Sequence, residues 1–328
     1  MMKKFVIAFF IVLTGTITAN AGTSLPALWK SVGNYNPADG NAVAETSIVV
    51  DQSGVINGGK PFTITFQCGD ETTWPPPPAN TPTLLIRDYF TKTVLKKIAW
   101  PNGGYRGFAV NKTINGLVHI FGTQDPSSEQ NQNAFVHSTL DATFMPTTGV
   151  VILQSNLYGS GIKDIASFAS PTPQGGWSVN YANPSGVGML SWPDANFTPG
   201  QQSPSNPNGW TNAVTGQPFS STMQAPDADY QASDGYWYAG VQNLESSPEL
   251  FWVTMGRSSD LIHWSFPTTP LLVPDMPALE GIDASDVRMA EYQGTTYIIY
   301  LCGDQATWSN IRTAVFYGTI AQLRAQFF

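Results

Sequence analysis

The chain has 328 residues and a formal net charge of −8, from 15 Lys and Arg against 23 Asp and Glu. A phosphate-binding surface needs clustered Lys and Arg, so this balance argues against nucleic acid and anionic membrane as partners. Charged residues make up only 12% of the chain, alongside 30 Gly and 25 Pro. That composition favours a loop-rich all-β body over a helical one.

The N-terminus has the pattern of a secretory leader. A basic start, MMKK, precedes the apolar run FVIAFFIVLTGTI and the small-residue end Ala19-Asn20-Ala21. The run is short for a membrane-spanning helix, which makes a membrane anchor the weaker interpretation. We therefore expect a signal peptide over residues 1–21 and a single domain over residues 22–328. The mature protein is expected to be secreted or periplasmic, without membrane contact, and monomeric.

Most of the remaining chain predicts short strands. Six runs alternate aromatic or β-branched residues with polar ones, which is typical of half-buried strands. They are PFTITF (61–66), LVHIFG (117–122), WSVNYA (177–182), YWYAGV (236–241), LFWVTM (250–255) and TTYIIYL (295–301).

A turn residue recurs at a regular interval. Short strands end at Asp88, Asp141, Asp194 and Asp260, spaced by 53, 53 and 66 residues, and a fifth unit ends at Gly318. Asp suits such turns because its side chain accepts hydrogen bonds from nearby backbone amides. Each interval can hold four short antiparallel strands. The pattern predicts an all-β five-bladed β-propeller in which each blade is a four-stranded antiparallel sheet. A jelly-roll sandwich predicts no such period.

Two distant segments nearly repeat each other. FQCGDETTW (66–74) and YLCGDQATW (300–308) share C-G-D-x-x-T-W and contain both cysteines of the chain. Such self-similarity indicates equivalent units, here blades one and five, which meet where a ring closes. Cys68 and Cys302 form either one intrachain disulfide or two buried free thiols. A zinc site is disfavoured with three His and no C-x-x-C, and we expect no cofactor. The acids leave Ca²⁺ in the central channel as an alternative that no loop motif supports.

A family resemblance rests on the last hundred residues. GRSSDLIHW (256–264) resembles the S-x-D-L-x-x-W turn of five-bladed glycoside hydrolases related to families 43, 32, 62 and 130. The blade openings are similar too, because Asp227 and Asp286 each precede a hairpin glycine, Gly235 or Gly294, by eight residues. Over the rest of the chain the resemblance is one of pattern. His263 and Trp264 are expected to be packing residues.

The resemblance implies a glycosidase site of three acids on different blades. Hydrolysis needs a carboxylic acid on the leaving oxygen and a carboxylate on the opposite face. The candidate catalytic residues are Asp164, Asp227, Glu280 and Asp286, with Asp283 competing with Glu280 and Glu45 as a weaker opener of blade one. This chain departs from the family on blade one, where the base is expected but no Asp-Pro opener occurs.

Four further residues are candidates for substrate binding. Arg106 could hold a carboxylate or hydroxyl groups, or form a structural ion pair. Trp74 and Trp308 could stack on sugar rings, or pack between blades, and Asp304 could bind hydroxyls beside Trp308.

These features predict an exported glycoside hydrolase that acts on a polysaccharide or oligosaccharide through paired carboxylates at the propeller funnel. The alternative is a non-catalytic carbohydrate-binding propeller, and a weaker one is a propeller for protein contacts. Two carboxylates roughly 5–10 Å apart at the funnel mouth would favour the enzyme.

Overall fold

The structure is a computed structural model that describes most of the strand-forming part of the chain. The described residues are 24–32, 35, 43–67, 83–99, 109–114, 116–123, 134–147, 150–154, 169–171, 177–183, 186–192, 203–206, 211–212, 223–231, 233–246, 249–260, 262–267, 269–304 and 309–328. The predicted signal peptide, residues 1–21, lies outside them. Within these ranges, no helix has the length and apolar character needed to cross a membrane.

The described residues form five four-stranded antiparallel sheets, numbered here in chain order. Sheet 1 is β2 (Val43–Val49), β3 (Phe62–Gln67), β4 (Thr83–Asp88) and β5 (Val94–Ala99). Sheet 2 is β6 (Ala109–Ile114), β7 (Leu117–Thr123), β8 (Ala134–Leu140) and β9 (Val150–Gln154). Sheet 3 is β10 (Ala169–Pro171), β11 (Trp177–Asn183), β12 (Gly186–Trp192) and β13 (Ser203–Asn206).

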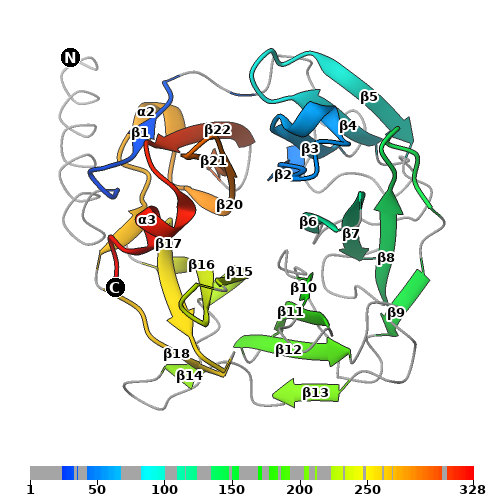
Figure 1. Cartoon of the computed structure of the whole chain (residues 1–328). Coiled ribbons are helices and arrows are strands. Elements are labelled where there is room, and N and C mark those ends of the chain that lie inside the picture. The colour runs from blue at the N-terminus through cyan, green and yellow to red at the C-terminus, as the bar shows by residue number, and fades with distance from the viewer. Residues whose placement is uncertain are drawn as a thin grey trace.

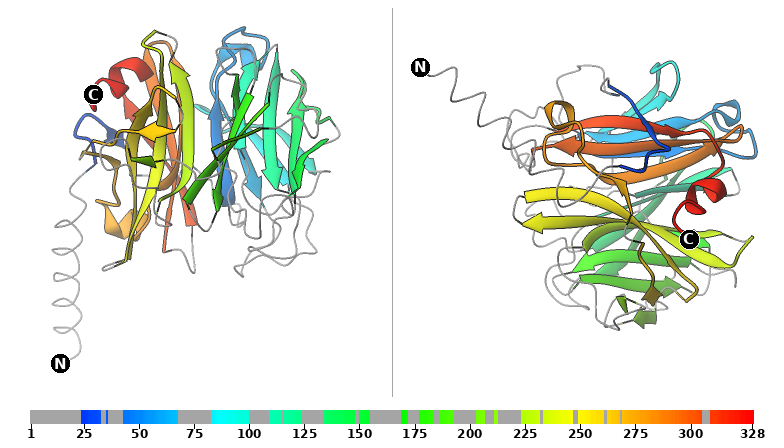
Figure 2. Two further views of the ribbon diagram at one scale, coloured as in Figure 1. Left: turned by 90° about the horizontal axis from the view of Figure 1, so that it is seen from below. Right: turned by 90° about the vertical axis from the view of Figure 1, so that its left-hand side faces the viewer.

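Sheet 4 is β15 (Met223–Gln231), β16 (Tyr236–Ser246), β17 (Glu249–Ser258) and β19 (Pro270–Leu272). Sheet 5 is β20 (Ser285–Tyr292), β21 (Thr295–Gly303), β22 (Ser309–Phe316) and β1 (Trp29–Lys30). A small parallel pair joins β14 (Thr211–Asn212) to β18 (His263–Trp264). Figure 1 shows the five sheets arranged around a ring, and Figure 2 shows their strands running between the two faces of that ring. The all-β prediction with four-stranded antiparallel sheets is confirmed.

The repeated Asp marks one particular turn of the sheets. Asp88, Asp141 and Asp260 each lie at or just after the end of the third strand of a sheet and precede the fourth. Each carboxylate accepts hydrogen bonds from two backbone N–H groups two to four residues later, at 2.8–3.0 Å. Asp194 lies outside the described residues. The period in the sequence is therefore the spacing of third-to-fourth strand turns.

Sheet 5 explains why its unit ends in Gly318 instead of Asp. Its fourth strand is β1, from the other end of the chain, with Trp29 opposite Val315 and Lys30 opposite Ala314. After β22 the chain turns at Gly318 into helix α3 (Ile320–Arg324), which begins with a capping box at Thr319. No third-to-fourth turn is needed there, because β1 arrives from residues far away in sequence.

The hydrophobic core lies between neighbouring sheets. One cluster joins sheets 1 and 2, another joins sheets 1 and 5, and a third joins sheets 4 and 5 with Leu25 and Leu323. Packing between sheets 4 and 5 is tight at Gly240, where an added Cβ would lie 2.7 Å from Cγ1 of Val287. A glycine is needed there because any side chain would displace the neighbouring sheet.

Cys302 carries a free thiol in this structure. It is buried on β21, and its Sγ lies 3.5 Å from the carbonyl oxygen of Asn310. Burial raises the pKa of the thiol to about 12. Cys68 lies outside the described residues. Of the two alternatives, a free thiol is therefore what the structure describes at Cys302, and the partner in the predicted bridge cannot be placed.

Candidate functional site

The first strands of sheets 1, 4 and 5 share a bulge near their start. An extra residue interrupts the ladder between Val43 and Glu45 in β2, between Gln224 and Asp227 in β15, and between Ser285 and Arg288 in β20. A bulge bends its strand and redirects a side chain, and bulges are frequent beside active sites. The predicted acids Glu45, Asp227 and Asp286 all lie in or next to these bulges.

Asp286 lies inside the bulge of β20 with a positive backbone dihedral, φ 46°. This left-handed region is uncommon for residues other than glycine and costs of the order of 1–3 kcal/mol. The side chain is half-buried. Such strain persists only where the surrounding structure enforces it, and it is enriched at functional sites. Asp286 is therefore the predicted acid with the strongest local signature of a site.

Asp227 does not occupy the position equivalent to Asp286. Both precede a hairpin glycine by eight residues, but the hairpins differ in length. In sheet 4 the last pair is Gln231–Tyr236, and in sheet 5 it is Tyr292–Thr295. Asp227 and Arg288 are the residues in equivalent positions, because each lies four residues before the last hairpin pair and directly after the bulge of its strand. The equal spacing to glycine is thus not a mark of equivalent positions.

The structure nevertheless brings the two acids onto adjoining strands. Asp227 pairs with Gly240, and Val287, next to Asp286, packs against that glycine. Counted from the last hairpin pair of each sheet, Asp227 is four residues back along β15 and Asp286 is six residues back along β20. Figure 1 shows β15 and β20 as the strands of sheets 4 and 5 nearest the centre of the ring. The side chain of Asp227 is outside the described residues.

Two further acids lie at the same end of sheet 5 as Asp286. Asp304 follows β21 at the end that pairs with the start of β20, where Ser285 lies opposite Leu301. Asp283 is buried just before β20, and its backbone bridges to Phe251 of sheet 4. We call Asp283, Asp286 and Asp304 the rim carboxylates. Three carboxylates at one strand end can bind sugar hydroxyls and exchange protons with a substrate.

Glu280 is held in a buried ion pair. It ends helix α2 (Pro277–Glu280), and its side chain is 0% exposed. Lys30 Nζ lies 2.6 Å from Oε1 and 2.8 Å from Oε2, Tyr300 donates its hydroxyl to Oε1 at 2.6 Å, and the Met276 N–H donates to Oε2 at 2.9 Å. Both oxygens are thus engaged, and this geometry fits a structural role better than that of an acid open to substrate.

The same lysine holds the N-terminal segment on sheets 4 and 5. Lys30 Nζ also donates to Asp275 at 2.7 Å and to the carbonyl of Val273 at 2.9 Å. Burial raises the pKa of Asp275, but the hydrogen bond and charge of Lys30 outweigh it and hold that pKa below its usual value. Burial and the charge of Glu280 raise the pKa of the Tyr300 phenol. Figure 1 shows α2 beside β1, on the outer side of sheet 5 and away from the ring centre.

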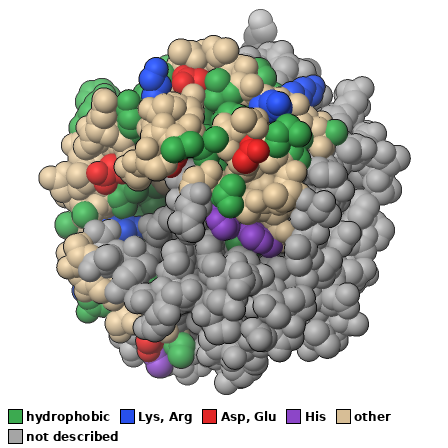
Figure 3. All heavy atoms as spheres, turned by 45° about the vertical axis from the view of Figure 1, so that its right-hand side comes forward, with side chains coloured by type: hydrophobic (Ala, Val, Ile, Leu, Met, Phe, Trp, Pro, Cys, Tyr) green, Lys and Arg blue, Asp and Glu red, His purple; other side chains and the backbone are tan. Residues whose placement is uncertain are grey.

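A histidine pair in sheet 2 was not foreseen from the sequence. His119 Nδ1 and His137 Nε2 are 3.1 Å apart, and their rings are inclined by only 19° with centroids 5.2 Å apart. The two nitrogens are within hydrogen-bond distance, so one donates and the other accepts, according to the tautomer of each ring. Burial and then the charge of His119 lower the pKa of His137 to about 3. Figure 3 shows two adjoining histidine side chains at the surface. The only indication of this pair in the sequence was one histidine in each of two neighbouring strands, His119 in β7 and His137 in β8.

The other predicted site residues cannot be placed. Asp164, Arg106, Trp74 and Trp308 lie outside the described residues, and only the backbone of Glu45 is described. Among the residues that the structure describes, no group of three or more His, Cys, Asp or Glu side chains could hold a metal ion.

Comparisons with known proteins match the fold and not the sequence. No protein-family model and no curated protein matches the chain. An α-L-arabinofuranosidase from Podospora anserina, solved with cellotriose, aligns with a TM-score of 0.60 at 11% identity over 89% of this chain and 98% of that one. An exo-1,5-α-L-arabinanase from a bovine ruminal metagenomic library aligns with a TM-score of 0.56 at 12% identity, over 85% and 95%.

A third solved neighbour catalyses a different reaction. It is an N-acetylgalactosamine deacetylase from F. plautii in complex with blood group B trisaccharide, with a TM-score of 0.55 at 12% identity over 91% of this chain and 97% of that one. The chain thus has the fold of the five-bladed propeller glycoside hydrolases that the sequence resembles. The deacetylase shows that this fold alone does not fix the reaction.

Proposed function

We propose that this protein is an exported glycoside hydrolase that cleaves a neutral polysaccharide or oligosaccharide at the start of the inner strands of a closed five-bladed propeller. The observation that carries the proposal is Asp286, a half-buried acid held at φ 46° inside a bulge of β20. Strained backbone at a redirected carboxylate is expected where a carboxyl group must meet a substrate.

The placement of two acids on adjoining inner strands supports hydrolysis. Glycosidases use two carboxyl groups about 5–5.5 Å apart when they retain configuration and about 6.5–9.5 Å apart when they invert it. Asp227 and Asp286 lie on adjoining inner strands of sheets 4 and 5, each at the bulge near the start of its strand. Asp227 and Asp286 are therefore the proposed pair, and Asp283 and Asp304 are proposed to bind sugar hydroxyls beside them. Glu280 has no catalytic role in this proposal, because its ion pair uses both oxygens.

Different observations support the other two parts of the proposal, which are closure of the propeller ring and the class of substrate. The pairing of β1 with β22 joins the two ends of the chain in one sheet, as closure of a ring requires. The net charge of −8 favours an uncharged glycan over an acidic one. Arabinan- and xylan-degrading enzymes are among the solved neighbours, so pentose-containing plant polysaccharides are the first substrates to test.

The proposal is tested by release of reducing sugar from arabinan, arabinoxylan and xylan. We expect Asp286→Asn and Asp227→Asn each to lower kcat/KM at least about 100-fold, the scale of a lost acid or base. Asp141→Asn is the matched control, because Asp141 is an exposed turn residue bonded only to local backbone and Thr143. Activity of the Asp286 variant equal to that of the control would overturn the assignment. Binding of a glycan without any hydrolysis would instead indicate the non-catalytic carbohydrate-binding alternative.

A further inference from the structure

A strip of aromatic side chains crosses from sheet 5 to the turn that ends β4. We call Trp29, Phe90, Tyr292, Tyr297 and Tyr317 the aromatic strip. Three of them are unusually exposed for large side chains: Trp29 at 69%, Tyr317 at 74% and Phe90 at 45%. Exposed apolar side chains are ordinary singly, but a contiguous set marks an interaction surface.

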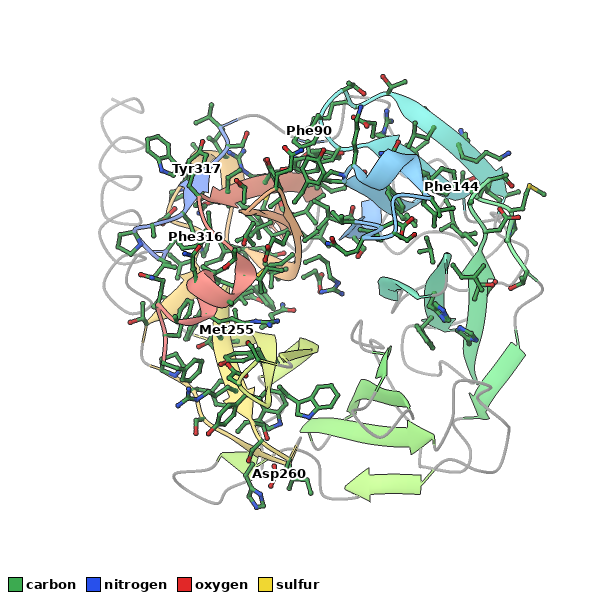
Figure 4. The ribbon with its side chains drawn as sticks, viewed as in Figure 1. Phe90, Phe144, Met255, Asp260, Phe316 and Tyr317 are labelled. Carbon is green, nitrogen blue, oxygen red and sulfur yellow. The ribbon has the colours of Figure 1, made fainter. Side chains whose placement is uncertain are left out.

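The strip is continuous across the two sheets. Tyr297 lies opposite Val315, which lies opposite Trp29, so these side chains form one row on one face of sheet 5. Trp29 contacts Tyr317 with ring centroids 6.5 Å apart, and Phe90 contacts Tyr297 at 5.4 Å and Tyr292 at 5.9 Å. Figure 4 shows Tyr317 beside β1 and Phe90 at the border between sheets 5 and 1.

The strip lies far from the rim carboxylates. Tyr292 is at the hairpin end of β20, whereas Asp286 is six residues away near its start. At about 3.3 Å per residue this separates the two along the strand by roughly 20 Å, across the thickness of the ring. A ligand on the strip would therefore leave the inner strand ends accessible.

We propose that the aromatic strip is a second glycan-binding surface, which holds a neutral polysaccharide chain by stacking of sugar rings on its aromatic faces. Sugar rings present apolar C–H faces that pack on aromatic rings, while tyrosine hydroxyls bond sugar hydroxyls. The net charge of −8 favours an uncharged polymer over an acidic one on this surface. The chemistry of this ligand is that of the proposed substrate, but binding at the strip does not require hydrolysis.

The exposed area of the strip favours a glycan over a second copy of the chain as its ligand. With about 200 Å² per aromatic side chain, the strip exposes roughly 500 Å². A stable protein interface needs about 800 Å² on each partner. The strip is thus large enough for a few sugar rings and too small for a stable dimer.

The test is affinity electrophoresis of the mature full-length protein in gels with and without soluble arabinoxylan or arabinan. We expect polysaccharide to retard the wild type, and the double variant Trp29→Ala/Tyr317→Ala to bind at least about tenfold more weakly. Tyr317→Phe keeps the ring and should keep most of the retardation. Val55→Ala is the matched control, because Val55 is 61% exposed in the connection between β2 and β3 and lies outside the strip.

Hydrolysis distinguishes this proposal from the catalytic one. The double variant should cleave a small aryl glycoside as fast as wild type, whereas Asp286→Asn should lose cleavage and keep its retardation. A wild type that no polysaccharide retards, or a double variant retarded as strongly as wild type, overturns the strip proposal whatever the activity. A dimer in size-exclusion chromatography that Trp29→Ala/Tyr317→Ala converts to monomer would also overturn it.

Discussion

Lys30 offers the sharpest test of how the N-terminal segment is fastened to sheet 5. Its side chain is 8% exposed and its Nζ lies within 2.9 Å of two carboxylates and one carbonyl. Replacing it by Met keeps the volume of the aliphatic stem but removes the charge. Glu280, 0% exposed, and Asp275, 20% exposed, would then lose their counter-ion.

The size of the effect follows from burial. Removing one partner of a buried ion pair costs about 3–5 kcal/mol, because an uncompensated charge stays behind in a medium of low dielectric. For a chain of this length, that corresponds to a loss of about 4–8 °C in Tm. An exposed lysine should cost far less, about 0–1 kcal/mol. Lys97→Met provides that comparison, since Lys97 is exposed on β5.

The assay is thermal and urea unfolding of wild type, Lys30→Met, Glu280→Gln, Lys97→Met and the double variant Lys30→Met/Glu280→Gln. We expect the double variant to recover part of the loss, because glutamine removes the stranded charge. A Lys30→Met variant within about 1 kcal/mol of Lys97→Met would refute the buried ion pair. So would a double variant less stable than the sum of its two single changes.

Three other outcomes are expected. The pKa of His137 is about 3 in the folded state and about 6.5 in the unfolded state. Its contribution to stability is therefore present above pH 6.5 and is lost as the pH falls toward 3, by at most about 1.4 kcal/mol per pH unit. His137→Gln should flatten that part of the plot of unfolding free energy against pH, and an unchanged plot would contradict the assignment. Gly240→Ala should destabilise by about 1–3 kcal/mol through overpacking, and the added change Val287→Ala should restore part of it, which urea midpoints would measure. Cys302 should be alkylated on unfolding without any reductant; labelling only after reduction would show a disulfide and contradict the free thiol.

Patterns that depend on residues close together in the sequence predicted much of the fold. The turn repeat at Asp88, Asp141 and Asp260 was readable because a carboxylate bonded to the next backbone amides acts within a few residues. The strands followed from alternation for the same reason. The fourth strand of sheet 5 could not be predicted from the sequence. β1 is two residues long and pairs with residues almost 285 positions later, so no local pattern announces it.

The candidate site was only partly readable. Asp286 was found by its place before a hairpin glycine, but its bulge and positive φ depend on pairing with β21. The equivalence of Asp227 and Asp286 was wrong because hairpin length differs between sheets 4 and 5. Glu280 was a candidate catalytic acid from the sequence, yet its ion-pair partner Lys30 is 250 residues away. Tertiary partners of this kind decide whether a carboxylate is structural or available for chemistry.

The central claim is that carboxylates at the start of the inner strands act on a sugar. The most direct measurement is a crystal structure of the Asp286→Asn variant with a bound arabino- or xylo-oligosaccharide. The account predicts a glycosidic oxygen within about 3.5 Å of the residue 286 side chain, and a second carboxylate about 5–10 Å from it across the bond. A sugar bound away from β15 and β20, or no second carboxylate within that range, would contradict it.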